Sequence, residues 1–145
     1  AMPQPHWIVV ANGSQARLLQ RDHPGTELRE IMHWVHPQTR QHMGNPDSAH
    51  RTSGMRGRSG LAPPQNASAH AREQFAREIS QWLKKAVDSQ GIGQLTVFAS
   101  NPFLGELMSH EHGLLERHVF ARHPLDLTSL TLPELDLRLH QHYGL

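Results

Sequence analysis

The apolar residues of this chain form strand-like runs in the first 35 residues and follow a helical spacing over residues 71–86. Residues 6–11 (HWIVVA) are apolar and β-branched almost throughout, which predicts a buried strand. Asn12-Gly13 marks a tight turn into a second strand at 16–21 (ARLLQR). The alternating polarity of residues 28–35 predicts a third, half-exposed strand. The chain is therefore expected to open as an antiparallel meander.

The most regular pattern is a helical stripe in the middle of the chain. Its apolar members recur every three or four positions, and they are Ala71, Phe75, Ile79, Trp82, Leu83 and Ala86. Asn66 or Ser68 suits the N-cap of this helix, and Gly91 suits its end. We expect Phe75 and Trp82 to belong to the core and not to a ligand site.

The last third of the chain alternates strand and helix signals. A buried strand is predicted at 94–100, a short helix after Pro102 and a strand at 117–122. The sequence Thr131-Leu132-Pro133-Glu134 is a capping box that opens a final helix. This order predicts a mixed β-sheet with helices on its faces, in a layered α/β domain, with α+β as the alternative.

Length and composition suit one soluble domain over residues 2–145, with Ala1 ahead of Met2 as a cloning remnant. No run approaches the roughly 18 apolar residues of a membrane helix, and the first residues lack the layout of a secretory signal. The chain contains no cysteine, which excludes disulfides and thiolate chemistry. We therefore predict a cytoplasmic protein without membrane insertion.

Residues 44–67 form a different kind of segment, because ten of these 24 residues are Gly, Pro or Ser. Such a composition predicts a flexible loop. Residues 40–77 carry six arginines against two acidic residues, whereas the whole chain has a net charge of +1. Arginine forks suit phosphate, so we predict contact with RNA or another polyanion. The predicted contact residues are Arg51, Arg56 and Arg58, flanked by Arg40, His50 and Arg72.

Other chemistry finds little support in the sequence. Histidine is abundant at 13 residues, but pairs such as His110/His112 lie two residues apart and would point to different sides of a helix. The patterns HExxH, GxSxG and the phosphate-binding glycine motifs are absent. We predict no metal site, no cofactor and no catalytic residue. A small-molecule hydrolase with a strand-end pocket at Asn12 and Gly13 is kept as a third alternative.

Four segments together resemble the bacterial host-attachment protein family: WIVVANGSQARLLQR, HAREQFAREISQWL, FASNPFLGELM and DLTSLTLPELDLRL. That family is in turn similar to the middle domain of eukaryotic and archaeal class-one peptide-release factors and of their ribosome-rescue relatives. The resemblance implies an RNase H-like fold, and it implies the ribosome and its RNA as a partner. It covers nearly the whole chain.

In the release factors a flexible loop before a long helix presents a Gly-Gly-Gln tip to the peptidyl-transferase centre. The corresponding stretch here is Pro63-Pro64-Gln65, so Gln65 takes the position of the loop tip. Proline fixes φ and has no N–H, which excludes the glycine-dependent conformations of that tip. The resemblance therefore implies a loop that docks on ribosomal RNA without hydrolysis.

The sequence leaves two main functional classes open. The first is a non-enzymatic cytoplasmic protein that binds ribosomal RNA or another polyanion and acts on attachment indirectly. The alternative is a protein-interaction module of an attachment or surface-polysaccharide pathway, whose loop orders on an unidentified protein partner. The two differ in salt dependence, since polyanion binding weakens steeply with ionic strength. The sequence does not decide the oligomeric state.

Overall fold

A computed structural model describes residues 5–36, 63–109 and 117–145; within the first long helix, only the backbone of residues 63–68 and 90 is described. The strands are β1 (His6–Ala11), β2 (Gln15–Arg21), β3 (Arg29–Val35), β4 (Gln94–Ala99) and β5 (Val119–His123). The helices are α3 (Pro63–Gln90), α4 (Phe103–Ser109) and α5 (Leu132–Tyr143). These elements confirm the predicted α/β class.

The five strands form one mixed sheet in the order β3-β2-β1-β4-β5. The β1–β2 and β2–β3 pairs are antiparallel, which confirms the predicted meander. The β1–β4 and β4–β5 pairs are parallel, and α3 makes the crossover to β4 on the way. β1 is thus the central strand, and its carboxyl end lies beside that of β4.

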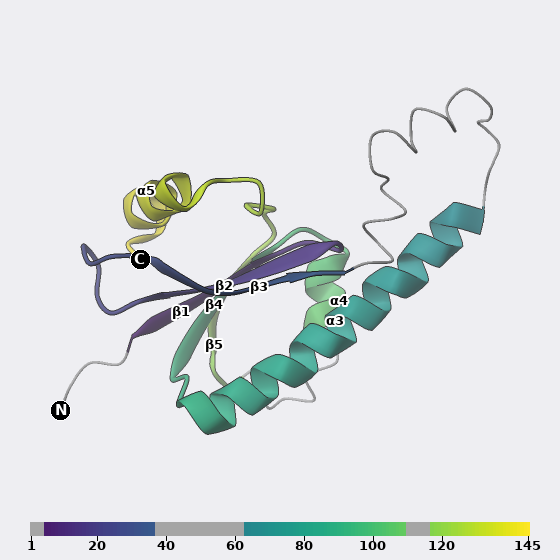
Figure 1. Ribbon diagram of the computed structural model, residues 1–145, viewed down its shortest axis with the longest axis horizontal. Helices are drawn as coiled ribbons and strands as arrows, with labels where there is room; N and C mark the ends of the chain where they lie inside the picture. The colour runs from purple at the N-terminus through teal and green to yellow at the C-terminus, as the bar shows by residue number, and fades with distance from the viewer. Residues whose placement is uncertain (1–4, 37–62, 110–116) are drawn as a thin grey trace.

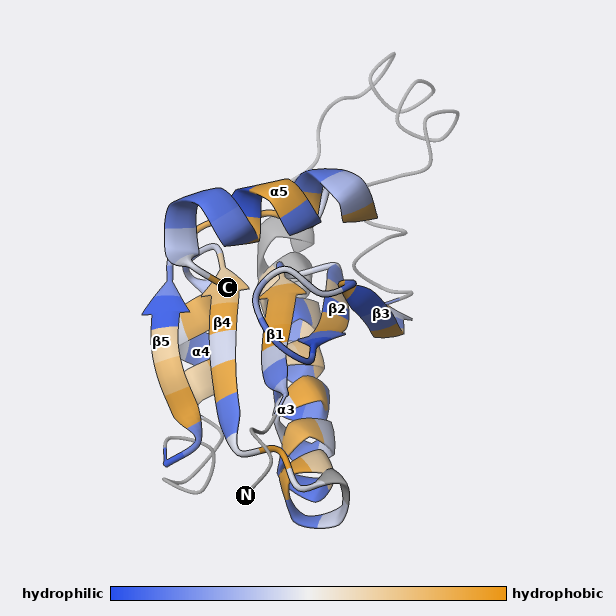
Figure 2. Ribbon diagram, turned by 90° about the vertical axis from the view of Figure 1, so that its left-hand side faces the viewer, coloured by the Kyte–Doolittle hydropathy of each residue, from blue (hydrophilic) through white to orange (hydrophobic). Residues whose placement is uncertain are grey.

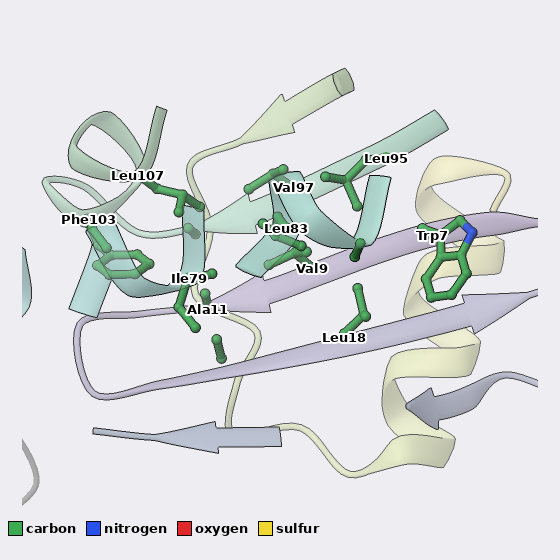
Figure 3. Packing of buried hydrophobic residues seen from close by; sticks show 14 of the residues in the cluster. Trp7, Val9, Ala11, Leu18, Ile79, Leu83, Leu95, Val97, Phe103 and Leu107 are labelled. Carbon is green, nitrogen blue, oxygen red and sulfur yellow. The ribbon is translucent and has the colours of Figure 1, made fainter. Parts of the chain in front are cut away.

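Helices cover both faces of the sheet, with α3 and α4 on one side and α5 on the other (Figure 1). Alternate residues of β1 serve the two layers: Trp7 and Val9 pack with α3 and α4, whereas Ile8 and Val10 pack with α5. Figure 3 shows Ile79 and Leu83 of α3 lying over Val9 in the first of these cores. Because β1 is buried on both faces, its sequence is a continuous apolar run.

The helix α3 begins earlier than the sequence predicted. The expected N-cap was Asn66 or Ser68, but the helix starts at Pro63, so Gln65 lies in its first turn and not at a loop tip. Proline is tolerated there because the first-turn N–H groups have no helical partner. The predicted end is confirmed, since Gly91 follows the helix with φ of +70°.

The apolar stripe of α3 packs as predicted. Ala71, Phe75 and Ile79 are buried against the sheet, as are Leu83 and Ala86 further along the helix. The Trp82 ring is only partly buried, and it meets the Trp34 ring of β3 edge to face at 4.8 Å between centroids. Such pairs add about 0.5–1.5 kcal/mol beyond the area that they bury.

The capping box of α5 is present in full. The Glu134 N–H donates to Thr131 Oγ1 at 3.3 Å, and the Thr131 N–H donates to Glu134 Oε1 at 2.8 Å. Gly144 closes the helix with φ of +67°, a left-handed conformation that favours glycine. Leu135 and Leu139 face inward, as predicted. No helix in the described ranges is both long and apolar enough to cross a membrane.

Candidate functional site

The turn between β1 and β2 is organised by one side chain. Asn12 Oδ1 accepts hydrogen bonds from the Ser14 N–H (2.8 Å), the Ser14 hydroxyl (3.0 Å) and the Gln15 N–H (3.0 Å). The Asn12 N–H donates to the Gln15 carbonyl at 2.9 Å. Asparagine is favoured in turns for this local bonding. The predicted Asn12-Gly13 turn is therefore confirmed.

The other end of the Asn12 amide reaches a segment more than a hundred residues away. Asn12 Nδ2 donates to Asp126 Oδ2 at 2.9 Å and to Thr128 Oγ1 at 3.0 Å. Asp126 Oδ1 accepts from the Thr128 N–H at 2.9 Å and from the Thr128 hydroxyl at 2.5 Å. These three residues, called the Asn12 cluster below, attach the chain before α5 to the carboxyl end of β1.

A buried arginine holds the same segment from the sheet. Arg17 of β2 is 7% exposed, and its Nη1 donates to the carbonyls of Thr128 (3.1 Å) and Leu130 (2.6 Å). The other edge of its guanidinium makes a two-pronged contact with Glu30 of β3, at 3.2 and 2.8 Å. The pairing with Glu30 compensates the buried charge, and the two carbonyls accept both N–H groups of Nη1.

Gly13 and Arg72 are in close contact beside this cluster. A Cβ added to Gly13 would lie 2.9 Å from Arg72 Cγ, closer than real Cβ contacts allow. The head of Arg72 is fixed by Glu106 of α4, with Nε–Oε1 at 2.7 Å and Nη2–Oε2 at 2.9 Å. Gly13 does not have the positive φ found at Gly25, Gly91 and Gly144. The glycine thus serves close packing.

Hydrogen bonds shift the pKa of Asp126 and that of Arg72. Partial burial pushes the pKa of Asp126 upward, but the bonds from Thr128 and Asn12 together outweigh it and hold the pKa below its ordinary value. Glu106 raises the pKa of Arg72 further above its ordinary high value. Both groups are therefore charged at neutral pH.

This arrangement makes the carboxyl end of β1 an anchor. Both polar atoms of the Asn12 side chain are bonded, and so are both carboxylate oxygens of Asp126. Three protein donors occupy three of the roughly four acceptor sites of this carboxylate, so most of its bonding serves the fold and not a substrate. In the described part of the chain, no three His, Cys, Asp or Glu side chains are grouped in a way that could hold a metal ion.

The structure describes only some of the predicted site residues. Arg40, His50, Arg51, Arg56 and Arg58 lie outside the described residues. Arg72 lies on α3, where Glu106 already engages its guanidinium. Asn12 and Gly13 lie together at the end of β1, as predicted, but within the anchor described above.

Two described residues, one before and one after residues 37–62, contact the β1–β2 turn. The His36 N–H, directly after β3, donates to the Ser14 carbonyl at 2.9 Å. On the other side, Arg72 of α3 packs on Gly13 and pairs with Glu106. The described chain therefore contacts the β1–β2 turn at His36, directly before residue 37, and again at Arg72, nine residues after the start of α3 at Pro63.

Sequence reasoning missed Asp126, Thr128 and Arg17 as parts of one arrangement. Only one signal was available, the Asp126-Leu127-Thr128 triplet. An Asp two residues before a Thr is typical of a turn in which the carboxylate accepts from the following backbone. The partner of that turn, Asn12, is 114 residues away from Asp126, and no short-range pattern connects them.

Comparison with known proteins gives one family. The family model described as "Protein required for attachment to host cells" matches residues 7–139, which include β1 from Trp7 onward, the other four described strands and α5 up to Leu139. No curated protein matches the chain. The family match agrees with the resemblance found in the four sequence segments.

Proposed function

The chain belongs to the family of proteins required for attachment to host cells, and we propose that it acts there as a non-enzymatic RNA-binding protein of the cytoplasm. The proposed ligand is structured RNA, with ribosomal RNA as the first choice. The proposed contacts are the phosphates, met by Arg51, Arg56 and Arg58. In this proposal the effect on attachment is indirect, through translation or its regulation.

One observation carries this proposal more than any other. His36, directly before residues 37–62, bonds Ser14, and Arg72 of the helix α3 that follows them packs on Gly13, so both flanking elements contact an anchor whose polar atoms bind one another. Such an anchor supports presentation of a basic segment better than it supports chemistry at Asn12. It argues against the hydrolase alternative.

The physical basis of binding is neutralisation of phosphates. Each arginine that meets a phosphate releases counterions from the nucleic acid. A plot of log binding constant against log salt concentration therefore has a negative slope, which grows by about 0.7 per contact on single strands and by about 0.9 per contact on a duplex. Three arginines should therefore contribute a slope of about two to three. Contacts of this kind give affinity with little sequence preference.

The distant likeness to the release-factor middle domain also supports RNA as the ligand. A mixed sheet whose first three strands form a meander, followed by parallel strands, is compatible with an RNase H-like domain. Gln65 lies in the first turn of α3, next to two prolines, so we propose no hydrolytic role for it. The proposal concerns docking alone.

The test is cosedimentation with purified ribosomes across a salt series, beside fluorescence anisotropy with a ribosomal RNA fragment. The test variant replaces Arg51, Arg56 and Arg58 by Ala. A matched control replaces three exposed arginines of the described surface and removes the same charge, at Arg77, Arg117 and Arg138. We expect salt-sensitive binding that is lost in the test variant and kept in the control.

Two results would contradict the proposal. Equal loss in both variants would indicate non-specific attraction to overall charge, and no binding at low salt would exclude the RNA ligand. A several-degree drop in melting temperature of the test variant would show that its arginines are structural. Cell fractionation tests the cytoplasmic part, since a protein found mostly outside the membrane contradicts an indirect role.

The second candidate, a protein-interaction module, is favoured by a different observation. Three large apolar side chains of β3 are exposed, namely Ile31, Met32 and Val35. Binding to a protein through such residues would change little with salt. Substituting the three loop arginines would then leave partner binding intact, whereas substitutions on β3 would remove it.

A further inference from the structure

The strand β3 is an edge of the sheet with an unusual surface. In the described part of the fold, β2 is the strand that pairs with it, and its other side is open (Figure 2). Ile31 is 45% exposed, Met32 37% and Val35 38%. An open edge with apolar side chains is a template for pairing with another strand.

The polar side chains of β3 do not protect this edge, because they are bonded back to β2. Arg29 donates to Gln20 (2.6 Å), Glu30 accepts from Arg17 (2.8 Å) and the His33 ring contacts Gln15 (2.9 Å). Neither lysine nor proline, two usual blockers of edges, occurs in REIMHWV, and the register shift of the β2–β3 ladder falls at Ile31, so the ladder is regular from Met32 to Val35. Among the described residues, the exposed apolar side chains of β3 therefore remain available to a partner.

The backbone of β3 presents hydrogen-bonding groups at the open side. His36 donates to Ser14, so this pair is bonded within the β2–β3 ladder. Bonded and non-bonded pairs alternate along an antiparallel ladder. The Val35 and His33 N–H and C=O groups, opposite Gln15 and Arg17, therefore point away from β2.

The residue pattern of the strand selects the partner. Ile31-Met32-His33-Trp34-Val35 reads as two apolar residues, His33, and two apolar residues, in either direction. An antiparallel pair of identical strands around a two-fold axis needs such a pattern, because each residue meets its mirror position. With the axis at His33, Ile31 faces Val35 of the second copy and Met32 faces Trp34.

We propose that two copies of this chain associate through β3, antiparallel and about a two-fold axis at His33, to give one continuous sheet across both copies. Apolar side chains face apolar ones on both sides of that sheet. Met32 meets the Trp34 ring, which Trp82 already supports from α3, and sulfur–aromatic contacts of this type are favourable. The opposite edge, β5 (VFARH), lacks the symmetric pattern.

The first experiment measures the mass of the full chain by sedimentation velocity and light scattering over a wide concentration range, without RNA. The wild type should approach twice the chain mass of 16.4 kDa. Ile31→Lys and Val35→Lys should stay monomeric, because each places a charge against an apolar side chain. Leu137→Lys is the matched control, on an α5 residue that is 58% exposed, and it should dimerise like the wild type.

The second experiment tests the register. The chain contains no cysteine, so a single His33→Cys variant has only its counterpart to react with. Cross-strand partners lie about 4.5–5.5 Å apart at Cα, within reach of a disulfide. Mild oxidation should give a covalent dimer for His33→Cys and much less for the control Leu137→Cys.

The outcomes decide the proposal in either direction. A wild type that stays monomeric at every concentration overturns the proposal. That result is expected if the β3 edge is covered by the chain itself or by another protein. A dimer that persists in both lysine variants also overturns it, since another surface then carries the association. Circular dichroism of each variant confirms that the substitution at an exposed position has left the fold intact.

Discussion

Removing the Asp126 carboxylate tests whether the Asn12 cluster is an anchor of the fold. In Asp126→Ala three hydrogen bonds lose their acceptor, from the Thr128 N–H, the Thr128 hydroxyl and Asn12 Nδ2. A net contribution of about 1 kcal/mol for each gives an expected loss of about 3 kcal/mol in the free energy of unfolding. Thr128 is buried, so its N–H would remain without a partner in the variant, and this cost supports the full loss of about 3 kcal/mol.

A second variant separates geometry from charge. Asp126→Asn keeps the shape of the side chain, but its amide has only one oxygen for two sets of donors. Either orientation therefore turns an NH₂ group toward Asn12 Nδ2 or toward the Thr128 donors. We expect Asp126→Asn to lose about 1–2 kcal/mol in the free energy of unfolding, so its stability should lie between that of the wild type and that of Asp126→Ala.

Urea unfolding followed by tryptophan fluorescence measures these differences, and its pH dependence supplies a further check. The Asp126 pKa is lowered in the folded state. Its contribution is therefore complete above the ordinary carboxyl pKa of about 4 and is lost as the pH falls below that value. The difference between wild type and Asp126→Ala should accordingly narrow on acidification below about pH 4.

The control is Asp22→Ala, which removes an exposed carboxylate whose ion pair in the described part of the chain is with Arg29, at 3.2 Å. A surface pair of this kind contributes about 0–1 kcal/mol. If Asp126→Ala costs no more than this control at neutral pH, or if its deficit is unchanged in acid, the anchor interpretation is wrong.

Three further predictions concern packing, each measured by urea unfolding. Ser80 is fully buried, and its hydroxyl has no hydrogen-bond partner among the described residues, so Ser80→Ala should stabilise the fold by about 1 kcal/mol. Gly13→Ala should destabilise by about 1–3 kcal/mol, because the new Cβ strikes the stem of Arg72, whereas Gly105→Ala in an open helical position should stabilise by about 0.5–1 kcal/mol. Leu139→Ala should cost about 2–5 kcal/mol, since this side chain of α5 is fully buried against the sheet. An unchanged midpoint for any of these variants would contradict the corresponding packing argument.

Much of the fold could be predicted because its signals are short-range. The continuous apolar run of β1, the stripe from Ala71 to Ala86 and the capping box at Thr131 are each contained within a few turns or one strand. These signals correctly indicated a mixed sheet between helices. The start of α3 at Pro63 was mispredicted, because a side-chain N-cap was weighted above the tolerance of the first turn for proline.

The anchor could not be predicted for the opposite reason. Nothing in the strand pattern of residues 16–21 marks Arg17 as buried, yet it is buried because Glu30 and two carbonyls from the far end of the chain meet it. Gly13 looked like a residue required by turn geometry, but its role is set by Arg72 on another element. The candidate arginines of the 44–67 segment stay a prediction from composition, apart from the described fold.

The division of the core between α5 and the other two helices has a consequence for biosynthesis. In the described fold, α5 covers the sheet face formed by Ile8, Val10 and Leu19, and it leaves the ribosome after all five strands of that sheet. The nascent chain can form the meander early, yet this apolar face stays uncovered until α5 has been made. Exposed apolar faces of that kind recruit chaperones and promote aggregation. Truncation or slow translation near Leu135 should therefore reduce the yield of intact protein more than equal changes in stability elsewhere.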